Sequence, residues 1–305
     1  MDTMKDRDIL LESGTNELEV IEFTLGGQNF GINVAKVEEI LRFNNEVTPM
    51  PHSNRYVEGV FRQRGTIITI INLAYYLGLP ESDNRENDIL IVTNFNNQKS
   101  AFHVHTVRDI HRISWQDIEK PDPTIYGGDA GVATGIVRYN DHLITIVDFE
   151  KIITDISPKS SIQIEEIEVM GDRRHSKKPL LLVEDSPMLE KLITKSLVKA
   201  GYENVITCSN GEEAWNRLQN YKKAPGDITE HVALIITDIE MPRMDGHHLI
   251  KLVREDRDLR YLPIIIFSSL INEEMYNKGK MLGATEQITK PEIGKLVRLI
   301  DIHLA

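Results

Sequence analysis

Short apolar runs that end abruptly at polar side chains restrict the fold of the second half of this chain more than any other feature. There are three such runs. Leu180–Val183 is followed by Glu184 and Asp185, 232–237 by Asp238, and 264–267 by Ser268. Stretches with apolar residues at helical spacing separate these runs. Strands that alternate with helices in this way predict a parallel sheet built from βαβ units.

Two helices can be placed from their end signals. Ser186 can cap a helix whose first position is Pro187, and Gly201 is a stop signal for that helix. Its apolar stripe consists of Leu189, Leu192, Ile193 and Leu197. A second stripe predicts a terminal helix that packs on the sheet, and it consists of Ile293, Leu296, Val297 and Ile300.

The polar side chains at the ends of the runs should meet. In an open parallel sheet ligands bind beyond the carboxyl ends of the strands, near the point where the strand order reverses. We therefore expect Glu184, Asp185, Asp238, Ser268 and Lys290 to converge there. Crowded carboxylates repel one another unless a hard cation such as Mg²⁺ or Mn²⁺ compensates their charge.

This set of residues suits phosphoryl transfer. The carboxylate of Asp238 can attack a phosphoryl donor and become an aspartyl phosphate. Lys290 supplies a positive charge and Ser268 a hydroxyl donor for the phosphoryl oxygens. Any one of these carboxylates alone would more often be a helix cap or a solvated loop residue. Their joint placement at the ends of successive strands favours the functional interpretation.

Residues 179–305 resemble a two-component receiver domain in these motifs. The resemblance implies a flavodoxin-like α/β fold with a five-stranded parallel sheet of order 2-1-3-4-5. It also implies a role for each matched position, namely Asp238 as phosphoacceptor, Asp185 as direct metal ligand, Glu184 as its neighbour, the main-chain carbonyl of Glu240 as a further ligand, Ser268 as switch hydroxyl and Lys290 as the receiver lysine.

Two positions depart from the receiver pattern. Ser268 replaces the more usual Thr, a mild change because the hydroxyl remains. Gln287 stands where many receivers place a switching aromatic side chain. The second departure puts the usual aromatic rotation in doubt and leaves the phosphorylation chemistry less affected.

Composition changes between the two halves of the chain. We predict a flexible segment over 1–16, a first domain over 17–156, a linker over 157–178 and the receiver over 179–305. The linker contains Pro158, a Ser pair, Gly171 and a solvated basic run over 173–178. Residues 162–170 within it could add an edge strand to either neighbour.

The first domain is rich in β-forming residues and contains an internal repeat. Residues 31–40 align without gaps on 101–110, and residues 67–73 align on 143–149, at offsets of 101 − 31 = 70 and 143 − 67 = 76. Two blocks in the same order at similar offsets predict two homologous β subdomains. No Gly-rich phosphate loop or pair of nucleophile and base is evident there, so binding is the default role.

The first domain resembles a CheW-like coupling domain from about Leu18 to Ile156, and the whole chain resembles the CheV family of chemotaxis proteins. This resemblance implies two interleaved SH3-like barrels that link chemoreceptor tips, the histidine kinase CheA and CheW. By position, the residues implicated in receptor or kinase contact are Arg64, Val37, Glu39 and Ile40. Alternatively, the apolar side chains of Val37 and Ile40 belong to the core, and Arg64 is a solvated hairpin residue.

Charge and composition exclude several other classes of protein. Acidic residues outnumber basic ones by 47 to 35, for a net charge of −12, which disfavours nucleic acid and anionic lipid as partners. The start of the chain is too polar for a signal peptide, and no apolar run approaches the ~20 residues that cross a bilayer. We therefore expect a cytoplasmic protein that reaches membrane receptor arrays through its partners.

Other candidate residues carry weaker signals. His247 and His248 are expected on a solvated helix face, and His103 and His105 on one face of a strand without a nearby third metal ligand. Cys208 is expected to be a small core residue.

The sequence therefore predicts an adaptor that is regulated by phosphorylation of Asp238 rather than an enzyme, although the receiver would catalyse its own phosphoryl transfer and hydrolysis. Two alternatives stay open: a phosphate sink that drains CheA, and a receiver that gates an unrecognised output activity. A DNA-binding output is disfavoured by the net charge.

Overall fold

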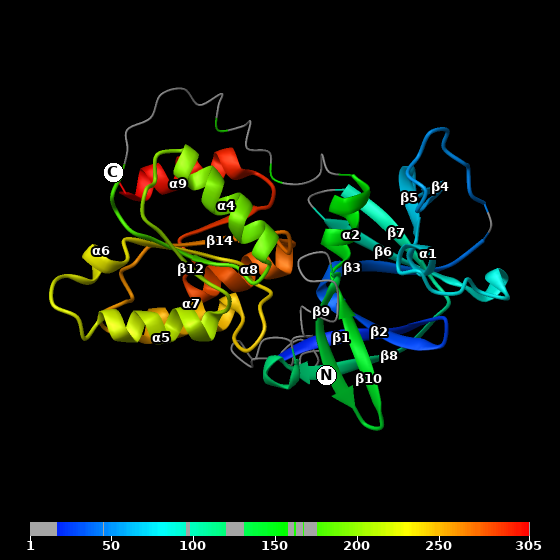
Figure 1. Cartoon of the computed structure of the whole chain (residues 1–305), viewed down its shortest axis with the longest axis horizontal. Coiled ribbons are helices and arrows are strands. Elements are labelled where there is room, and N and C mark those ends of the chain that lie inside the picture. Colours follow the sequence, from blue (N-terminus) through cyan, green and yellow to red (C-terminus); the bar gives the residue numbers. More distant parts are fainter. Residues whose placement is uncertain are drawn as a thin grey trace, which may run out of the picture. The chain divides into compact units, whose positions relative to one another are not determined.

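A computed structural model of the chain describes residues 17–304 except 45, 96–97, 120–130, 158–161, 163–166 and 168–175. It contains two compact units, one over 17–160 and one that includes 161–305 (Figure 1). Most of the sequence 162–170, a candidate edge strand, lies outside the described residues. No helix in the described ranges is long and apolar enough to span a bilayer.

The first unit is built from two five-stranded sheets. Its strands are β1 Glu17–Leu25, β2 Gln28–Asn33, β3 Val37–Arg42, β4 Val57–Gln63, β5 Thr66–Asn72, β6 Ile89–Phe95, β7 Gln98–Val104, β8 Thr106–Ser114, β9 Ala133–Tyr139 and β10 His142–Val147. Four short helical segments lie between these strands, namely η2 Val34–Lys36, α1 Leu73–Tyr76, η3 Arg85–Asn87 and η4 Trp115–Asp117, and the helix α2 Phe149–Ile156 follows β10.

The two sheets exchange strands, which confirms the predicted repeat. One sheet has the order β8-β1-β2-β10-β9 and the other β3-β6-β7-β5-β4. At the predicted offsets, β1 to β5 correspond to β6 to β10, so both sheets have the same order of equivalent strands. Each sheet takes two strands from one repeat and three from the other. The parallel pairings β2–β10 and β5–β7 join the repeats.

The repeat extends to the helices that follow β5 and β10. The side chain of Asn72 accepts a hydrogen bond from the Tyr75 N–H and caps α1. Seventy-six residues later, Asp148 accepts from the Lys151 N–H and caps α2. Equivalent caps stabilise equivalent helix starts, since each satisfies a backbone donor that the first turn leaves unpaired.

The second unit is an α/β domain with a parallel sheet of order β12-β11-β13-β14-β15, as predicted. Its strands are β11 Leu180–Val183, β12 Val205–Cys208, β13 Leu234–Thr237, β14 Ile264–Ser268 and β15 Glu286–Thr289. Its helices are α4 Pro187–Lys199, α5 Gly211–Tyr221, α6 Ile228–His231, α7 Gly246–Glu255, α8 Glu273–Leu282 and α9 Ile293–Leu304.

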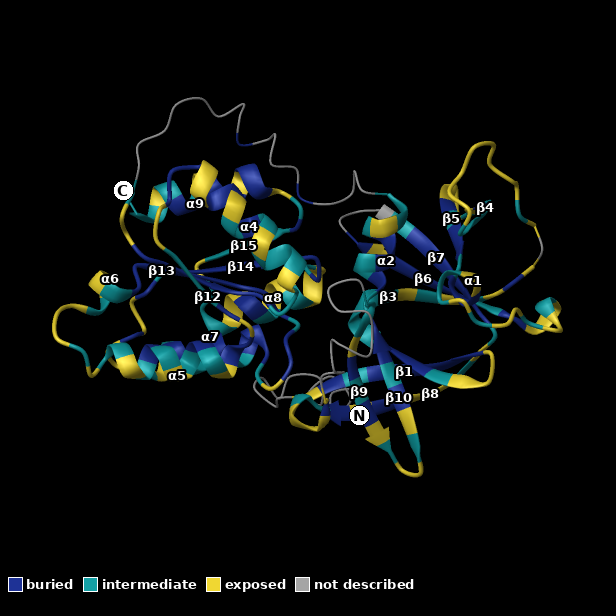
Figure 2. Ribbon diagram, viewed as in Figure 1, coloured by how far each residue is buried: buried dark blue, intermediate teal, exposed yellow. Residues whose placement is uncertain are grey.

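Burial explains why the second unit folds in this way. The strands β11, β13 and β14 are buried along their whole length (Figure 2), because α4 and α9 cover one face of the sheet and α5, α7 and α8 the other (Figure 1). Ser186 caps α4 through the Leu189 N–H, with Pro187 at the first position as predicted. The helix ends at Lys199, and Gly201 follows at φ +96°.

Candidate functional site

The carboxyl ends of β11, β13, β14 and β15 bring the predicted polar side chains together. Lys290, just after β15, donates hydrogen bonds of 2.7 Å to Glu184 Oε2 and 2.7 Å to Asp238 Oδ2. All three side chains are almost completely buried, as is Ser268 at the end of β14. The topology causes this convergence, because adjacent parallel strands end at the same edge of the sheet.

Asp238 is held as a carboxylate by its surroundings. Burial raises its pKa, but the charge and hydrogen bond of Lys290, the Ser268 hydroxyl and the Ile239 N–H outweigh burial and lower the pKa below its usual value. The Ile239 N–H donates to Asp238 Oδ1 over 2.6 Å. Asp238 is therefore ionised at neutral pH, which a nucleophilic oxygen requires.

Glu184 has the opposite tendency. Burial raises its pKa, and the neighbouring charges of Asp238 and Asp185 raise it further, while Lys290 opposes the increase. Its Oε1 accepts a hydrogen bond of 3.2 Å from the Ser186 N–H at the start of α4. The side chain is thus fixed in place while its negative charge is only partly compensated.

The donor set fits a divalent hard cation. Glu184, Asp185 and Asp238 each offer a carboxylate oxygen, and these atoms all lie within 4.8 Å of one another. Two of these carboxylates, Glu184 and Asp238, share the ammonium group of Lys290. Mg²⁺ and Mn²⁺ prefer oxygen ligands of this kind.

The remaining receiver positions lie near the same edge of the sheet. Glu240 is two residues beyond Asp238, in the loop between β13 and α7. The Ser268 hydroxyl accepts a hydrogen bond of 3.2 Å from the Leu270 N–H. This bond and the polar neighbours of Asp238 fix the loop that leads from β14 towards α8.

Gln287, in the middle of β15, faces α8. Its Nε2 donates a hydrogen bond of 2.7 Å to the Tyr276 carbonyl. A methyl group added at Gly279 would lie 2.8 Å from Gln287 Cδ and 2.8 Å from Ile266 Cδ1, so the glutamine amide fills a notch that only glycine leaves in α8. The position predicted to differ from the usual receiver aromatic therefore holds a hydrogen-bonded side chain that is packed against a helix.

The structure corrects the expectation for His247. It lies at the start of α7 but is 3% exposed, and its Nε2 has no hydrogen-bond partner among the described residues. Burial and the charge of Lys278 lower its pKa to about 3, so the imidazole is neutral. The prediction of a solvated face failed because the apolar face of α7, which packs on the sheet, includes this position. Cys208 is buried as expected.

The predicted coupling residues lie on β3 and at the tip of the β4–β5 hairpin. Arg64, at the tip, is 80% exposed and forms an ion pair of 2.6 Å with Glu39. Ile40 points outward and is 43% exposed, whereas Val37 is partly buried against the core. Three of the four predicted side chains thus reach the surface at neighbouring positions, and Val37 faces inward.

A second polar cluster, in the first unit, escaped the sequence analysis. His103 Nδ1 lies 3.0 Å from Glu58 Oε1, and its Nε2 lies 3.0 Å from Asp88 Oδ2. Arg85 donates to Glu58 Oε2 over 2.7 Å, and the His103 ring stacks on Phe43. The four polar residues come from three segments, namely β4, the η3 turn with its C-cap Asp88, and β7, so no local motif links all of them. The acidic loop that includes Asp88 was the only feature of the sequence that could have pointed to this cluster.

Comparison with known proteins agrees with this architecture. Residues 19–157 match the CheW-like domain family, and residues 180–301 match the response regulator receiver domain family. The chemotaxis protein CheV3 of Helicobacter pylori is 31% identical over 304 residues, which cover 94% of this chain and 94% of that protein. The chain belongs to the CheV family. The family resemblance inferred from the sequence motifs is confirmed.

Other similar proteins match one half of this CheV-family chain. The chemotaxis protein CheW of Thermotoga maritima is 29% identical over 152 residues, which cover 50% of this chain and 98% of that protein. A structure of the chemotaxis protein CheY4 of Vibrio cholerae, at 29% identity, covers 42% of this chain and 98% of that one with a TM-score of 0.36. As a member of the CheV family, the protein is a chemotaxis coupling protein that carries a receiver domain.

Proposed function

We propose that the protein couples chemoreceptor tips to the histidine kinase CheA, together with CheW, and that phosphoryl transfer from CheA to Asp238 regulates this coupling. The observation that carries the proposal is the buried contact of Lys290 with both Asp238 and Glu184. It supplies an ionised nucleophile, an adjacent positive charge and an acidic neighbour in one site. The protein then acts as a cytoplasmic adaptor rather than as an enzyme with an external substrate.

In the proposed transfer, a carboxylate oxygen of Asp238 attacks the phosphorus of the kinase's phosphohistidine. A P–O bond forms, the P–N bond breaks, and the imidazole leaves with the electron pair and takes up a proton. Lys290 and the Ser268 hydroxyl stabilise the negative charge on the phosphoryl oxygens. The chain's own part is positioning and charge neutralisation, as is general for phosphoryl transfer. Later attack by water would return Asp238 to its free form.

Glu184, Asp185, Asp238 and the Glu240 carbonyl would hold Mg²⁺ or Mn²⁺. When bound, the cation would neutralise negative charge on the carboxylates and on the phosphoryl oxygens. Support for this assignment comes from the three carboxylate oxygens that lie within 4.8 Å of one another.

Phosphorylation would change the partners of Lys290 and Ser268. Both side chains now interact with Asp238 itself, and a phosphoryl group would present new oxygens to both. Ser268 is in the strand that leads to α8, and Gln287 ties β15 to that helix. A change at the acidic site therefore has a short route to the surface of α8. In the other domain, we propose Arg64, Glu39 and Ile40 for partner contact, while Val37 is partly buried against the core.

The decisive experiment is transfer of labelled phosphate from phospho-CheA to the purified full chain with Mg²⁺. We expect the chain to become labelled, and Asp238→Asn to abolish the label. Asp185→Asn should slow transfer, because it weakens metal binding. Asp258→Asn, an exposed carboxylate in the same domain, is the matched control and should retain full labelling. Undiminished labelling of Asp238→Asn would refute the assignment of Asp238 as the phosphoacceptor.

A second measurement separates regulated coupling from a phosphate sink. Pull-down of CheA and of receptor fragments would be compared with and without beryllofluoride, a phosphoryl mimic, and Mg²⁺. A regulated adaptor should bind differently in the two conditions. If binding is equal with and without the mimic while labelling is normal, the receiver acts only as a phosphate sink.

A further inference from the structure

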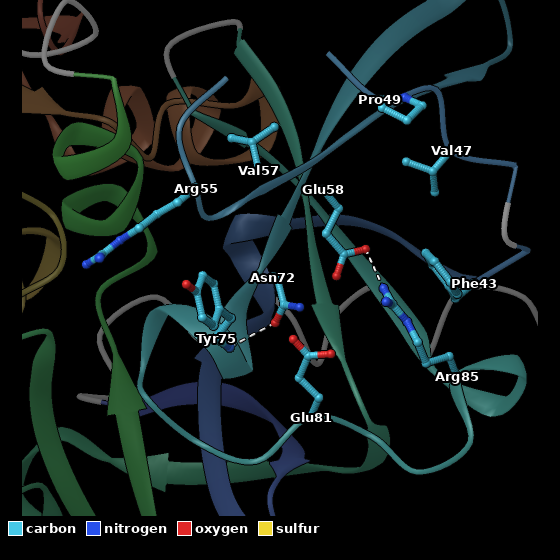
Figure 3. Close-up of a pocket in the computed structure, with 10 residues that line it drawn as sticks. All are labelled: Phe43, Val47, Pro49, Arg55, Val57, Glu58, Asn72, Tyr75, Glu81 and Arg85. Carbon is cyan, nitrogen blue, oxygen red and sulfur yellow. Dashed lines mark hydrogen bonds and ion pairs between the residues drawn. The ribbon is translucent and has the colours of Figure 1, made fainter. Parts of the chain in front are cut away.

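The polar cluster of Glu58, Arg85, Asp88 and His103 lies beside a pocket of about 470 Å³ in the first unit, and Figure 3 shows the residues that line this pocket. Glu58 and Arg85 line the pocket directly, and the other two lie behind them, around a second, much smaller cavity. Asp88 and His103 are almost completely buried. Burying so many charged groups is costly, and a well-packed apolar replacement is often as stable or more stable.

The internal repeat shows that the fold does not need this cluster. At the equivalent positions of the other repeat, Thr134 corresponds to Glu58, Asn33 to His103, Leu18 to Asp88 and Ile113 to Phe43. None of these four carries a charge, yet the same strands form the same sheet there. The fold therefore does not require charged residues at these positions, and the other sheet buries a different ion pair, that of Glu22 and His111. The cluster around His103 lies beside a cleft, and clustered ionisable groups at a cleft favour a binding role.

The charge at the mouth of the pocket selects the ligand. The charged lining residues are Glu58, Glu81, Arg55 and Arg85. The loop 81–88 that borders the pocket carries four carboxylates, one of them the buried Asp88, against one guanidinium, a net charge of −3. Arg85 is already occupied, because it pairs with Glu58 and its guanidinium lies 5.2 Å from the Phe43 ring centroid. Arg55 hydrogen-bonds the hydroxyl of its neighbour Tyr56 and extends away from the other lining side chains in Figure 3. Glu81 lines the pocket and has no hydrogen bond or ion pair to any described residue.

The remaining walls suit a long cationic side chain. Val47 and Pro49 provide apolar surface along one wall, and Tyr75 contributes an aromatic ring that is 46% exposed. An aliphatic stem can pack on the first two residues while a planar guanidinium stacks on the aromatic ring and pairs with Glu81. An anionic ligand would be repelled by the carboxylates of the loop 81–88.

We propose that this pocket binds an arginine side chain presented by a partner protein. The site is in the coupling domain, so it does not depend on phosphorylation of Asp238 or on a bound cation. Glu81 supplies the ionic contact and Tyr75 the stacking surface, while the buried cluster holds Glu58 and Arg85 in place behind them.

The test titrates N-acetyl-L-arginine methylamide into the ¹⁵N-labelled full chain and follows amide shifts by NMR. We expect saturable shifts at residues that line the pocket, among them Val47, Tyr75 and Glu81. The citrulline analogue, of the same shape but neutral, should bind at least several-fold more weakly. Equal binding of the two analogues would overturn the proposal. So would binding of N-acetyl-L-glutamate methylamide that is lost in Arg85→Gln, because the pocket would then be an anion site.

A pair of variants tests whether the arginine analogue binds through Glu81 itself or only through the overall negative charge of the loop. Glu81→Gln and Glu86→Gln each remove one negative charge from the same exposed loop, but only Glu81 lines the pocket. We expect Glu81→Gln to weaken binding about threefold to fivefold, the size of a partly exposed ion pair, and Glu86→Gln to leave it nearly unchanged. Equal weakening by both variants would contradict the proposal, and the spectra themselves report whether each variant is folded.

Discussion

Lys290 is the residue on which the acidic site depends in the absence of metal. It is 3% exposed and contacts two buried carboxylates, so replacing it with methionine leaves Glu184 and Asp238 uncompensated. We expect Lys290→Met to lower the free energy of unfolding by about 3–5 kcal/mol at pH 8. The measurement is urea unfolding without Mg²⁺, with Trp215 in α5 as reporter in a Trp115→Phe background.

The loss should shrink as the pH falls. Without the ammonium group, the pKa values of the buried carboxylates rise above those of the unfolded chain, so the folded state binds more protons. Stability is then present at low pH and lost as the pH rises through the folded pKa. Lys295→Met, at an exposed ion pair in α9, is the matched control and should have almost no effect. If Lys290→Met unfolds at the same urea concentration as the parent, both at pH 8 and at a lower pH, the ion pairs of Lys290 do not contribute to stability.

Cys208 is the single thiol of the chain, and its environment makes it inert. It is 3% exposed at the end of β12, and burial raises its pKa from 9.0 to about 12. The thiolate fraction at neutral pH is therefore far smaller than for an ordinary thiol, and the thiolate is the reactive form. We expect an aromatic disulfide reagent to react at least a hundredfold more slowly with the folded chain than with the chain in urea. Rapid reaction in native buffer would show that β12 opens readily.

At the scale of elements, α8 and β15 are joined by the fit of Gln287 into the notch at Gly279. Ala at 279 would displace the glutamine amide and strain its bond to the Tyr276 carbonyl, which we expect to cost about 1–2 kcal/mol. In a Gln287→Ala background the same change should cost less, because only the close contact with Ile266 Cδ1 remains and Ala favours a helix by roughly 0.5–1 kcal/mol over Gly. A double-mutant cycle by urea unfolding measures this coupling. Additive costs would mean that the two residues do not share a packing site.

Elements with local signals were predictable from the sequence. The apolar run at β11, the Ser186 cap and the stripe of α4 each identify their element without long-range information. Helix α2 was not predicted, because its Ile- and Phe-rich sequence also suits a strand and packing against the first unit's core decides its state.

Contacts between distant segments were less predictable. The receiver-like edge could be inferred because parallel strands must end together. The cluster around His103 could not, because Glu58 on β4 comes near His103 through the pairing of β5 with β7, which skips β6. The repeat predicted two equivalent subdomains from the sequence blocks, but it could not give the pairings through which they exchange strands.

At the scale of the whole molecule, strand exchange makes the first domain a single folding unit. Each sheet needs strands from both repeats, so neither repeat can bury its apolar faces alone. We expect fragments 17–80 and 81–157 to be unfolded when expressed separately and to form a complex with native-like circular dichroism when mixed. The cut lies in an exposed connection between α1 and β6. A fragment that folds alone would show that one sheet is stable without the exchanged strands.

The two units have separate hydrophobic cores, and a cation should act on only one of them. If Mg²⁺ binds the folded acidic site and not the unfolded chain, as we propose, it should stabilise that unit by RT ln(1 + [L]/Kd), about 1.4 kcal/mol at ten times Kd. Each unit contains one tryptophan, Trp115 in the first and Trp215 in the second, so single-tryptophan variants report each transition separately. We expect Mg²⁺ to raise the unfolding midpoint seen by Trp215, to leave that seen by Trp115 unchanged, and to lose its effect in Asp185→Asn. An equal shift at both tryptophans would mean that the units unfold together, and no shift at Trp215 would mean that the carboxylate cluster does not hold the cation.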